Sequence, residues 1–101
     1  MHLIQILLPL SYNDGAPIPD SSFLKIQSTL TSRFGGLTAF SRSPAKGIWK
    51  QAGKTLLDDI IVVEVMTETL DLPWWQDFRT QVEIKLHQEE IVIRTHKVQT
   101  L

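Results

Sequence analysis

Hydrophobic residues at the start of the chain follow the two-residue period of a β-strand. Residues 2–8 are apolar on both alternating faces, which predicts a strand buried on both sides, and Gln5 is the polar exception in its middle. Residues 11–20 are rich in turn formers and are expected to form a loop.

The pattern then changes to helical spacing, with apolar residues at Phe23, Ile26, Leu30 and Phe34. This spacing predicts a helix over residues 22–34, capped at its start by Asp20 or Ser21. Gly35 and Gly36 should end the helix, because glycine readily adopts the left-handed conformation that satisfies the last carbonyls.

The middle of the chain predicts a long β-arm. A strand over residues 37–42 is expected to be interrupted by Pro44 and Gly47 and to resume at 48–50. Residues 55–67 give the strongest strand signal of the chain, because they are rich in β-branched residues.

A second helix and a last strand complete the pattern. Asp71 is the expected cap of a helix that holds Pro73 in its first turn and continues to about residue 87. Its apolar stripe consists of Trp75, Phe78, Val82 and Leu86. Residues 91–98 supply the final strand.

The resulting order, β-α-β-β-α-β, predicts one α+β domain over residues 1–101 with a ferredoxin-like fold. In this fold a four-stranded antiparallel sheet carries both helices on one face. The end of the first helix (residues 30–40) and the end of the second (84–94) have similar patterns, which fits two β-α-β halves.

The face of the sheet away from the helices should be polar if water covers it. Strand 55–67 is instead apolar on both faces, with Ile61, Val63 and Val65 on one and Ile60, Val62 and Met66 on the other. We therefore expect a homodimer packed sheet to sheet, as in a dimeric α+β barrel. Trp49, near the tip of the β-arm, Ile60 and Val62 are the expected contacts.

Composition removes several classes of partner. With 10 basic and 11 acidic residues and a net charge of −1, the chain lacks the basic field that nucleic acids and anionic membranes require. It contains no cysteine, which removes disulfides, thiolate catalysis and cysteine-based metal sites. His2, His87 and His96 lack a metal-binding spacing, so we expect no metal and no cofactor.

The N-terminal apolar segment is short and lacks a basic region and a small-residue cleavage site. No segment approaches the roughly 20 apolar residues that span a bilayer. These features predict a cytoplasmic protein that does not enter the membrane.

Two polar residues interrupt the central strands and are the main candidate site. If strands 2–8 and 55–67 are neighbours, Gln5 and Glu64 could project together from the open face, with Arg94 or Thr38 as partners. A carboxylate in an apolar cavity can act as a general acid or base. The competing interpretation is a satisfied hydrogen-bond network that specifies the dimer.

Four segments resemble a small uncharacterised bacterial family: Met1–Leu10, Arg33–Phe40 (RFGGLTAF), Gly47–Lys50 (GIWK) and Gln88–Arg94 (QEEIVIR). They are also similar to a broader domain of unknown function. The resemblance implies a stand-alone bacterial protein with a ferredoxin-like fold and brings no activity with it. It directs attention to Arg33, Gln88 and Glu89 at the helix ends, as candidate ligand contacts or as joints between helix and strand.

Two functional hypotheses follow. The first is a homodimeric, non-catalytic binding or interaction module that holds a small ligand between its sheets. The second is a small cofactor-free enzyme of the dimeric α+β barrel type, with acid–base or oxygen chemistry in the cavity between sheets. The sequence leaves open whether the protein is an enzyme.

Overall fold

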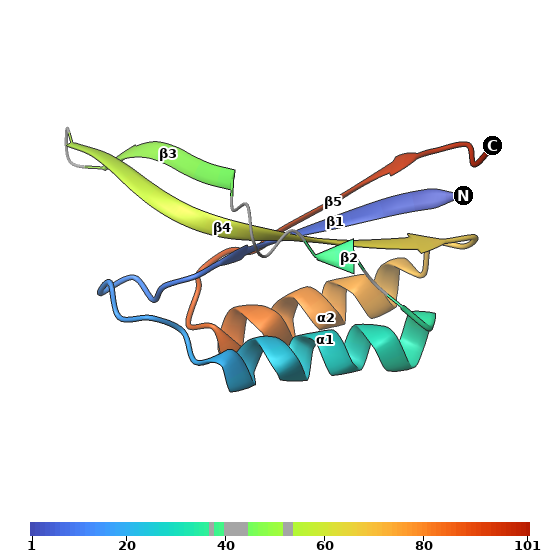
Figure 1. Ribbon diagram of the computed structural model, residues 1–101, viewed down its shortest axis with the longest axis horizontal. Helices are drawn as coiled ribbons and strands as arrows, with labels where there is room; N and C mark the ends of the chain where they lie inside the picture. The colour runs from blue at the N-terminus through green and yellow to red at the C-terminus, as the bar shows by residue number, and fades with distance from the viewer. Residues whose placement is uncertain (37, 40–44, 52–53) are drawn as a thin grey trace.

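The computed structural model describes residues 1–36, 38–39, 45–51 and 54–101, and at 39, 45–51 and 54–59 it describes the backbone alone. The elements are β1 (His2–Pro9), α1 (Asp20–Phe34), β2 (Thr38–Ala39), β3 (Ala45–Gln51), β4 (Lys54–Thr67), α2 (Leu72–Lys85) and β5 (Val92–Lys97). Both helices pack side by side on one face of an antiparallel sheet (Figure 1). The predicted α+β architecture is therefore confirmed.

Strand β1 lies at the centre of the sheet. The strand order is β2-β4-β1-β5, and β3 also pairs with β4. Of the predicted strand over residues 37–42, the structure places 38–39 in β2, whereas 37, 40–44 and hence Pro44 lie outside the described residues. The expectation that Gly47 interrupts pairing is wrong: it lies within β3 opposite Asp58, because the long edge of β4 offers it a partner.

The start of α1 also differs from the prediction. Pro19, with φ −60°, occupies the N-cap position, and no side chain caps the helix. The helix starts at Asp20, so the two expected cap residues lie inside its first turn. There the negative charge of Asp20 interacts favourably with the positive end of the helix dipole. The predicted ending is confirmed: Gly35 has φ 80°, and its N–H donates to the carbonyl of Thr31 at 2.8 Å.

Helix α2 begins as predicted. The Asp71 side chain accepts a hydrogen bond from the N–H of Trp74 at 3.2 Å, and Pro73 lies in the first turn. The helix ends at Lys85, two residues earlier than expected, because His87 adopts a left-handed conformation with φ 53° that no helix can continue.

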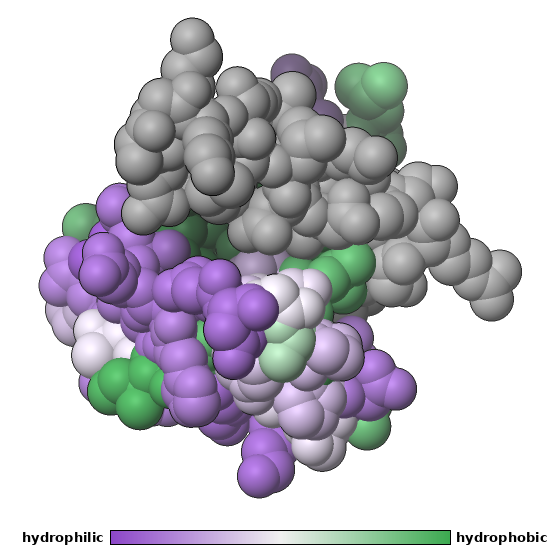
Figure 2. Space-filling view, turned by 90° about the vertical axis from the view of Figure 1, so that its left-hand side faces the viewer, coloured by the Kyte–Doolittle hydropathy of each residue, from purple (hydrophilic) through white to green (hydrophobic). Residues whose placement is uncertain are grey.

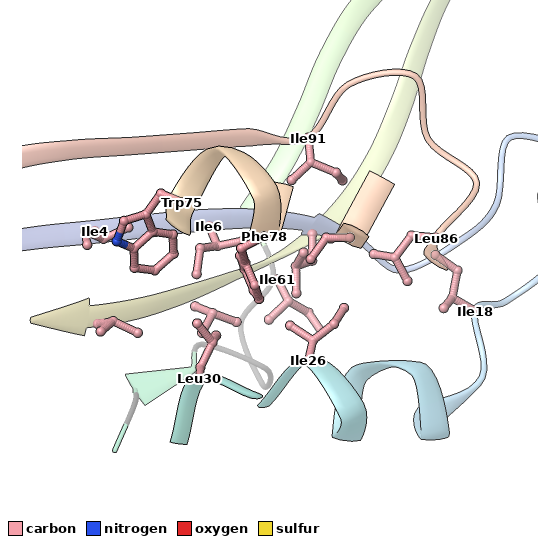
Figure 3. Packing of buried hydrophobic residues seen from close by; sticks show 14 residues of the cluster. Ile4, Ile6, Ile18, Ile26, Leu30, Ile61, Trp75, Phe78, Leu86 and Ile91 are labelled. Carbon is pink, nitrogen blue, oxygen red and sulfur yellow. The ribbon is translucent and has the colours of Figure 1, made fainter. Parts of the chain in front are cut away.

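The core lies between the sheet and the helices (Figure 3). Alternate residues of β1 and β4 face the helices, and the predicted stripes of both helices face the sheet. The buried residues are Ile4, Ile6, Leu8, Ile18, Ile26, Leu30, Ile61, Val63, Val65, Trp75, Phe78, Val82, Leu86 and Ile91. The burial of Ile18 was not predicted, because the segment around it is rich in turn formers and was expected to be a loop.

Four aromatic residues join the end of α1 to the start of α2. Phe34 stacks on Trp75 with ring centroids 5.3 Å apart, and Trp74 stacks on Phe78 at 5.2 Å. Edge-to-face contacts connect the two stacked pairs. Trp75, predicted to be a core residue, is 6% exposed and stabilises the packing of the two helices.

The β3–β4 hairpin extends past the helices at one end of the molecule, while both termini lie at the other (Figure 1). In the part of the chain that the structure describes, neither helix is long and apolar enough to cross a membrane.

Candidate functional site

The register of the sheet brings three of the predicted site residues into one row. Gln5 of β1 lies opposite Glu64 of β4 on one side and Arg94 of β5 on the other. Thr38 of β2 lies opposite Glu64 and extends the row toward the sheet edge. Since Ile4 faces the helices and side chains alternate along a strand, the row lies on the opposite, open face.

Hydrogen bonds connect the three side chains. Gln5 Nε2 donates to Glu64 Oε2 at 2.7 Å, and Arg94 Nε donates to Gln5 Oε1 at 2.8 Å. A guanidinium only donates and a carboxylate only accepts, so the amide of Gln5 fits between them in one orientation. Gln5 and Glu64 are half-buried and Arg94 is exposed. The row thus joins one negative and one positive charge through a neutral amide.

Apolar side chains lie on both sides of this row. Leu3 and Met66 pair on one side, and Leu7 pairs with Val62 and Val92 on the other. We call these five residues, together with Gln5, Glu64 and Arg94, the open face. Met66 is 54% exposed and Val92 is 48% exposed, so much of this apolar surface contacts water in the single chain.

The three predicted dimer contacts have different outcomes. Val62 belongs to the open face, and Ile60, two residues before it on β4, shares its side of the strand; both are half-buried. The backbone of Trp49 lies in β3 opposite Leu56, and its side chain lies outside the described residues.

The hydrogen bond between Gln5 and Arg94 should contribute measurably to the free energy of unfolding. In a double-mutant cycle, Gln5→Leu and Arg94→Leu should show a coupling energy of about 1 kcal/mol, because each substitution removes the same hydrogen bond. Denaturant unfolding of the four proteins at one fixed concentration measures it, since association would otherwise shift the midpoint. As a control, Gln5→Leu and Lys97→Leu should be additive. Coupling near zero in the first cycle would contradict the contact.

Arg33 lies far from this row, at the junction between the helices. Its guanidinium makes an ion pair with Asp71 at 3.0 Å and lies over the ring of Trp74, 5.0 Å from the centroid. The two charged side chains are 44% and 50% exposed. These contacts hold the end of α1 against the cap of α2. The sequence had suggested instead a joint between the helix end and the strand that follows it.

The side chain of Asp71 should stabilise the fold more by capping α2 than by its ion pair with Arg33. Asp71→Ala should lower the free energy of unfolding by about 1 kcal/mol, because it removes the acceptor for the N–H of Trp74. Asp71→Asn keeps a capping oxygen and removes the exposed ion pair, so it should cost clearly less. Urea unfolding of both variants measures the difference. Equal losses would show that the ion pair dominates.

Gln88 and Glu89 lie at the opposite end of α2. Gln88 Nε2 donates to the carbonyl of Leu86 at 3.0 Å, and the Gln88 N–H donates to the carbonyl of Glu83 at 2.9 Å. The Glu83 carboxylate accepts the N–H of Ile91 at 2.9 Å, which connects the helix to β5. Glu89 is exposed. Below the part drawn in grey, the surface at this end of the molecule is mostly hydrophilic, with a few hydrophobic side chains among the polar ones (Figure 2).

The predicted site residues therefore fall into three places. Gln5, Glu64 and Arg94 form one group, Arg33 lies at the junction of the two helices, and Gln88 and Glu89 lie in the turn between α2 and β5. Within the described residues, no group of three or more His, Asp or Glu side chains could hold a metal ion.

One feature on the helix side was missed from the sequence. A groove of about 140 Å³ lies between α2 and the edge strand β5, and it is lined in part by Gln76, Arg79 and Thr95. The available signal was the spacing of Leu72, Trp75, Gln76 and Arg79, which places these side chains along one side of a helix.

No protein-family model matches the chain, and no curated protein matches it. The resemblance to a small bacterial family therefore stays a prediction.

Solved structures do match the fold. A phage SAM lyase in complex with S-methyl-5'-thioadenosine aligns with a TM-score of 0.67 and 12% identity, over 95% of this chain and 80% of the lyase. The divalent cation tolerance protein CutA1 from Thermus thermophilus aligns with a TM-score of 0.64 and 13% identity, over 99% and 86% of the two chains. The periplasmic divalent cation tolerance protein CutA from Archaeoglobus fulgidus aligns with a TM-score of 0.63 and 16% identity, over 99% of this chain and 86% of CutA. At these identities the similarity establishes a shared ferredoxin-like α+β fold.

Proposed function

We propose that this protein is a homodimeric binding module in which two copies cover each other's open face, sheet against sheet. The observation that carries the proposal is the open face itself. It presents Leu3, Leu7, Val62, Met66 and Val92 on the side of the sheet that the helices leave uncovered. Covering such a surface removes apolar area from water, which favours association.

The polar row is compatible with burial in this interface. Covering a lone charge would be costly, but Glu64 and Arg94 are joined through Gln5, so their charges compensate within each copy. A guanidinium has five N–H donors and a carboxylate has two oxygens, so both ends of the row retain capacity for a further partner. That capacity would align the two copies in one register.

The same capacity supports the finer part of the proposal, a small ligand held between the sheets. A ligand there would contact apolar side chains on two sides and one charged group at each end of the row. If such a ligand is converted, Glu64 is the acid–base group closest to it. A thermal-shift screen of metabolites that finds a hit sensitive to Glu64→Gln would support this part.

The molar mass of the native protein in solution tests the dimer directly. Light scattering after size-exclusion chromatography at micromolar concentration should give twice the chain mass of 11.5 kDa. A single-chain mass across the micromolar range would overturn the proposal.

A further inference from the structure

A groove on the helix side of the sheet has the properties of a small-ligand site. Helix α2 contributes Leu72, Trp75, Gln76 and Arg79 to its walls, and β5 contributes Ile93 and Thr95. The helical residues recur at three- and four-residue spacing, which places them on one side of α2. Ile93 and Thr95 are two residues apart in β5, so they lie on the same face of the strand. Since the groove and the open face lie on opposite sides of the sheet, the proposed dimer leaves the groove accessible.

The lining of this groove combines apolar and polar side chains. Leu72, Trp75 and Ile93 are apolar, and Trp75 is 6% exposed and held in the aromatic cluster. Gln76 and Thr95 add an amide and a hydroxyl. Apolar walls with a few convergent polar groups are typical of small-molecule sites.

The positive charge available to the groove comes from Arg79. Arg94 also belongs to the lining, but its guanidinium lies on the open face and donates to Gln5. No aspartate or glutamate is among the described residues that line the groove. Arg79 Nε makes an ion pair with Glu83 Oε2 at 4.0 Å, a separation too long for a hydrogen bond, so the N–H groups of the guanidinium keep their capacity to donate. That same oxygen accepts the N–H of Ile91 at 2.9 Å, so Glu83 is engaged in closing α2 onto β5. The guanidinium of Arg79, 50% exposed, can therefore bind an anion.

We propose that this groove binds a small organic carboxylate whose apolar body is about the size of one ring. The carboxylate would contact Arg79, since a guanidinium matches its planar, two-oxygen geometry. The ring would lie on Trp75 and Ile93. The volume of about 140 Å³ sets the size, because a cavity of roughly 150 Å³ accommodates a benzene ring.

Benzoate and its neutral analogue benzamide test the proposal on the full chain in its native oligomeric state. In two-dimensional amide NMR, benzoate should give saturable shifts at Gln76, Ile93 and Thr95. Benzamide should bind about tenfold more weakly or worse, because it cannot form the charged pair with Arg79. Equal affinity for the two compounds, or shifts confined to other parts of the chain, would overturn the proposal.

Variants separate the groove from a general charge effect. Arg79→Gln should weaken benzoate about tenfold or more, whereas Lys85→Gln, which removes a charge from the same helix outside the groove, should leave the affinity unchanged. Gln76→Phe fills the groove while keeping Arg79, and it should also abolish the shifts. If Arg79→Gln and Lys85→Gln have the same effect, the groove site is wrong. Because none of these residues belongs to the open face, this result is independent of whether the protein dimerises.

Discussion

Replacing Phe78 with alanine should lower the free energy of unfolding by about 3–5 kcal/mol. Phe78 is 4% exposed and contacts both tryptophans of α2, with ring centroids 5.2 Å from Trp74 and 5.5 Å from Trp75. Truncation removes the buried ring and leaves a cavity that the aromatic cluster cannot close, because its rings are held by stacking on two sides. For a domain of this size the midpoint of thermal unfolding should fall by about 4–8 °C per kcal/mol.

Ile84→Ala is the matched control on the same helix. Ile84 is 71% exposed, so its truncation removes little buried surface, and alanine has the higher helix propensity. Its midpoint should stay within a few degrees of the native value. Calorimetry or circular dichroism at one fixed concentration measures both variants. A loss at Phe78 no larger than that at Ile84 would contradict the core described in Figure 3.

Substituting Met66 with glutamate should convert the proposed dimer into single chains. Met66 is 54% exposed in the single chain, so a glutamate there leaves the fold intact but places a charge in the covered interface. Burying an unpaired carboxylate costs several kcal/mol, enough to weaken association a thousandfold or more by order-of-magnitude estimate. Light scattering should then report the single-chain mass at micromolar concentration.

Leu24→Glu is the control for this variant. Leu24 lies on α1 and is 61% exposed, so the substitution adds the same charge to the helix layer, outside the sheet face. It should leave the dimer intact. Val92→Glu, on β5 and 48% exposed, should behave like Met66→Glu. If Leu24→Glu dissociates the protein and the two sheet variants do not, the helices and not the sheets form the interface.

Much of the fold could be predicted from local patterns. The stripe Trp75, Phe78, Val82 and Leu86 is buried as expected, because helical spacing alone brings these residues onto one face. Glycine at position 35 and aspartate at position 71 mark a helix end and a helix start, because their local backbone chemistry is specific. The predicted cap of α1 was wrong. Pro19 occupies the N-cap position, and its side chain has no hydrogen-bonding group that would identify it as a cap in the sequence.

The members of the candidate site could also be predicted from the sequence, but their contacts could not. Polar residues at positions 5 and 64 within apolar strands stand out in the sequence, since such residues need partners. Their pairing depends on the register of β1 against β4 and β5, and a shift of one residue would move every side chain to the other face. Arg33, Gln88 and Glu89 are marked equally well by sequence motifs. In the structure Arg33 joins α1 to the start of α2, whereas Gln88 makes a local hydrogen bond in the turn after α2.

By itself the sequence determined both helices and the strands β1, β4 and β5, the buried face of each helix, and the apolar character of both faces of β1 and β4. These properties depend on neighbours within a few residues. Only the tertiary structure decided that Glu64, Gln5 and Arg94 form one connected row, and that Arg79 lies beside a groove with Thr95. Those contacts join residues far apart in the chain. They depend on strand order and register, which are properties of the whole sheet.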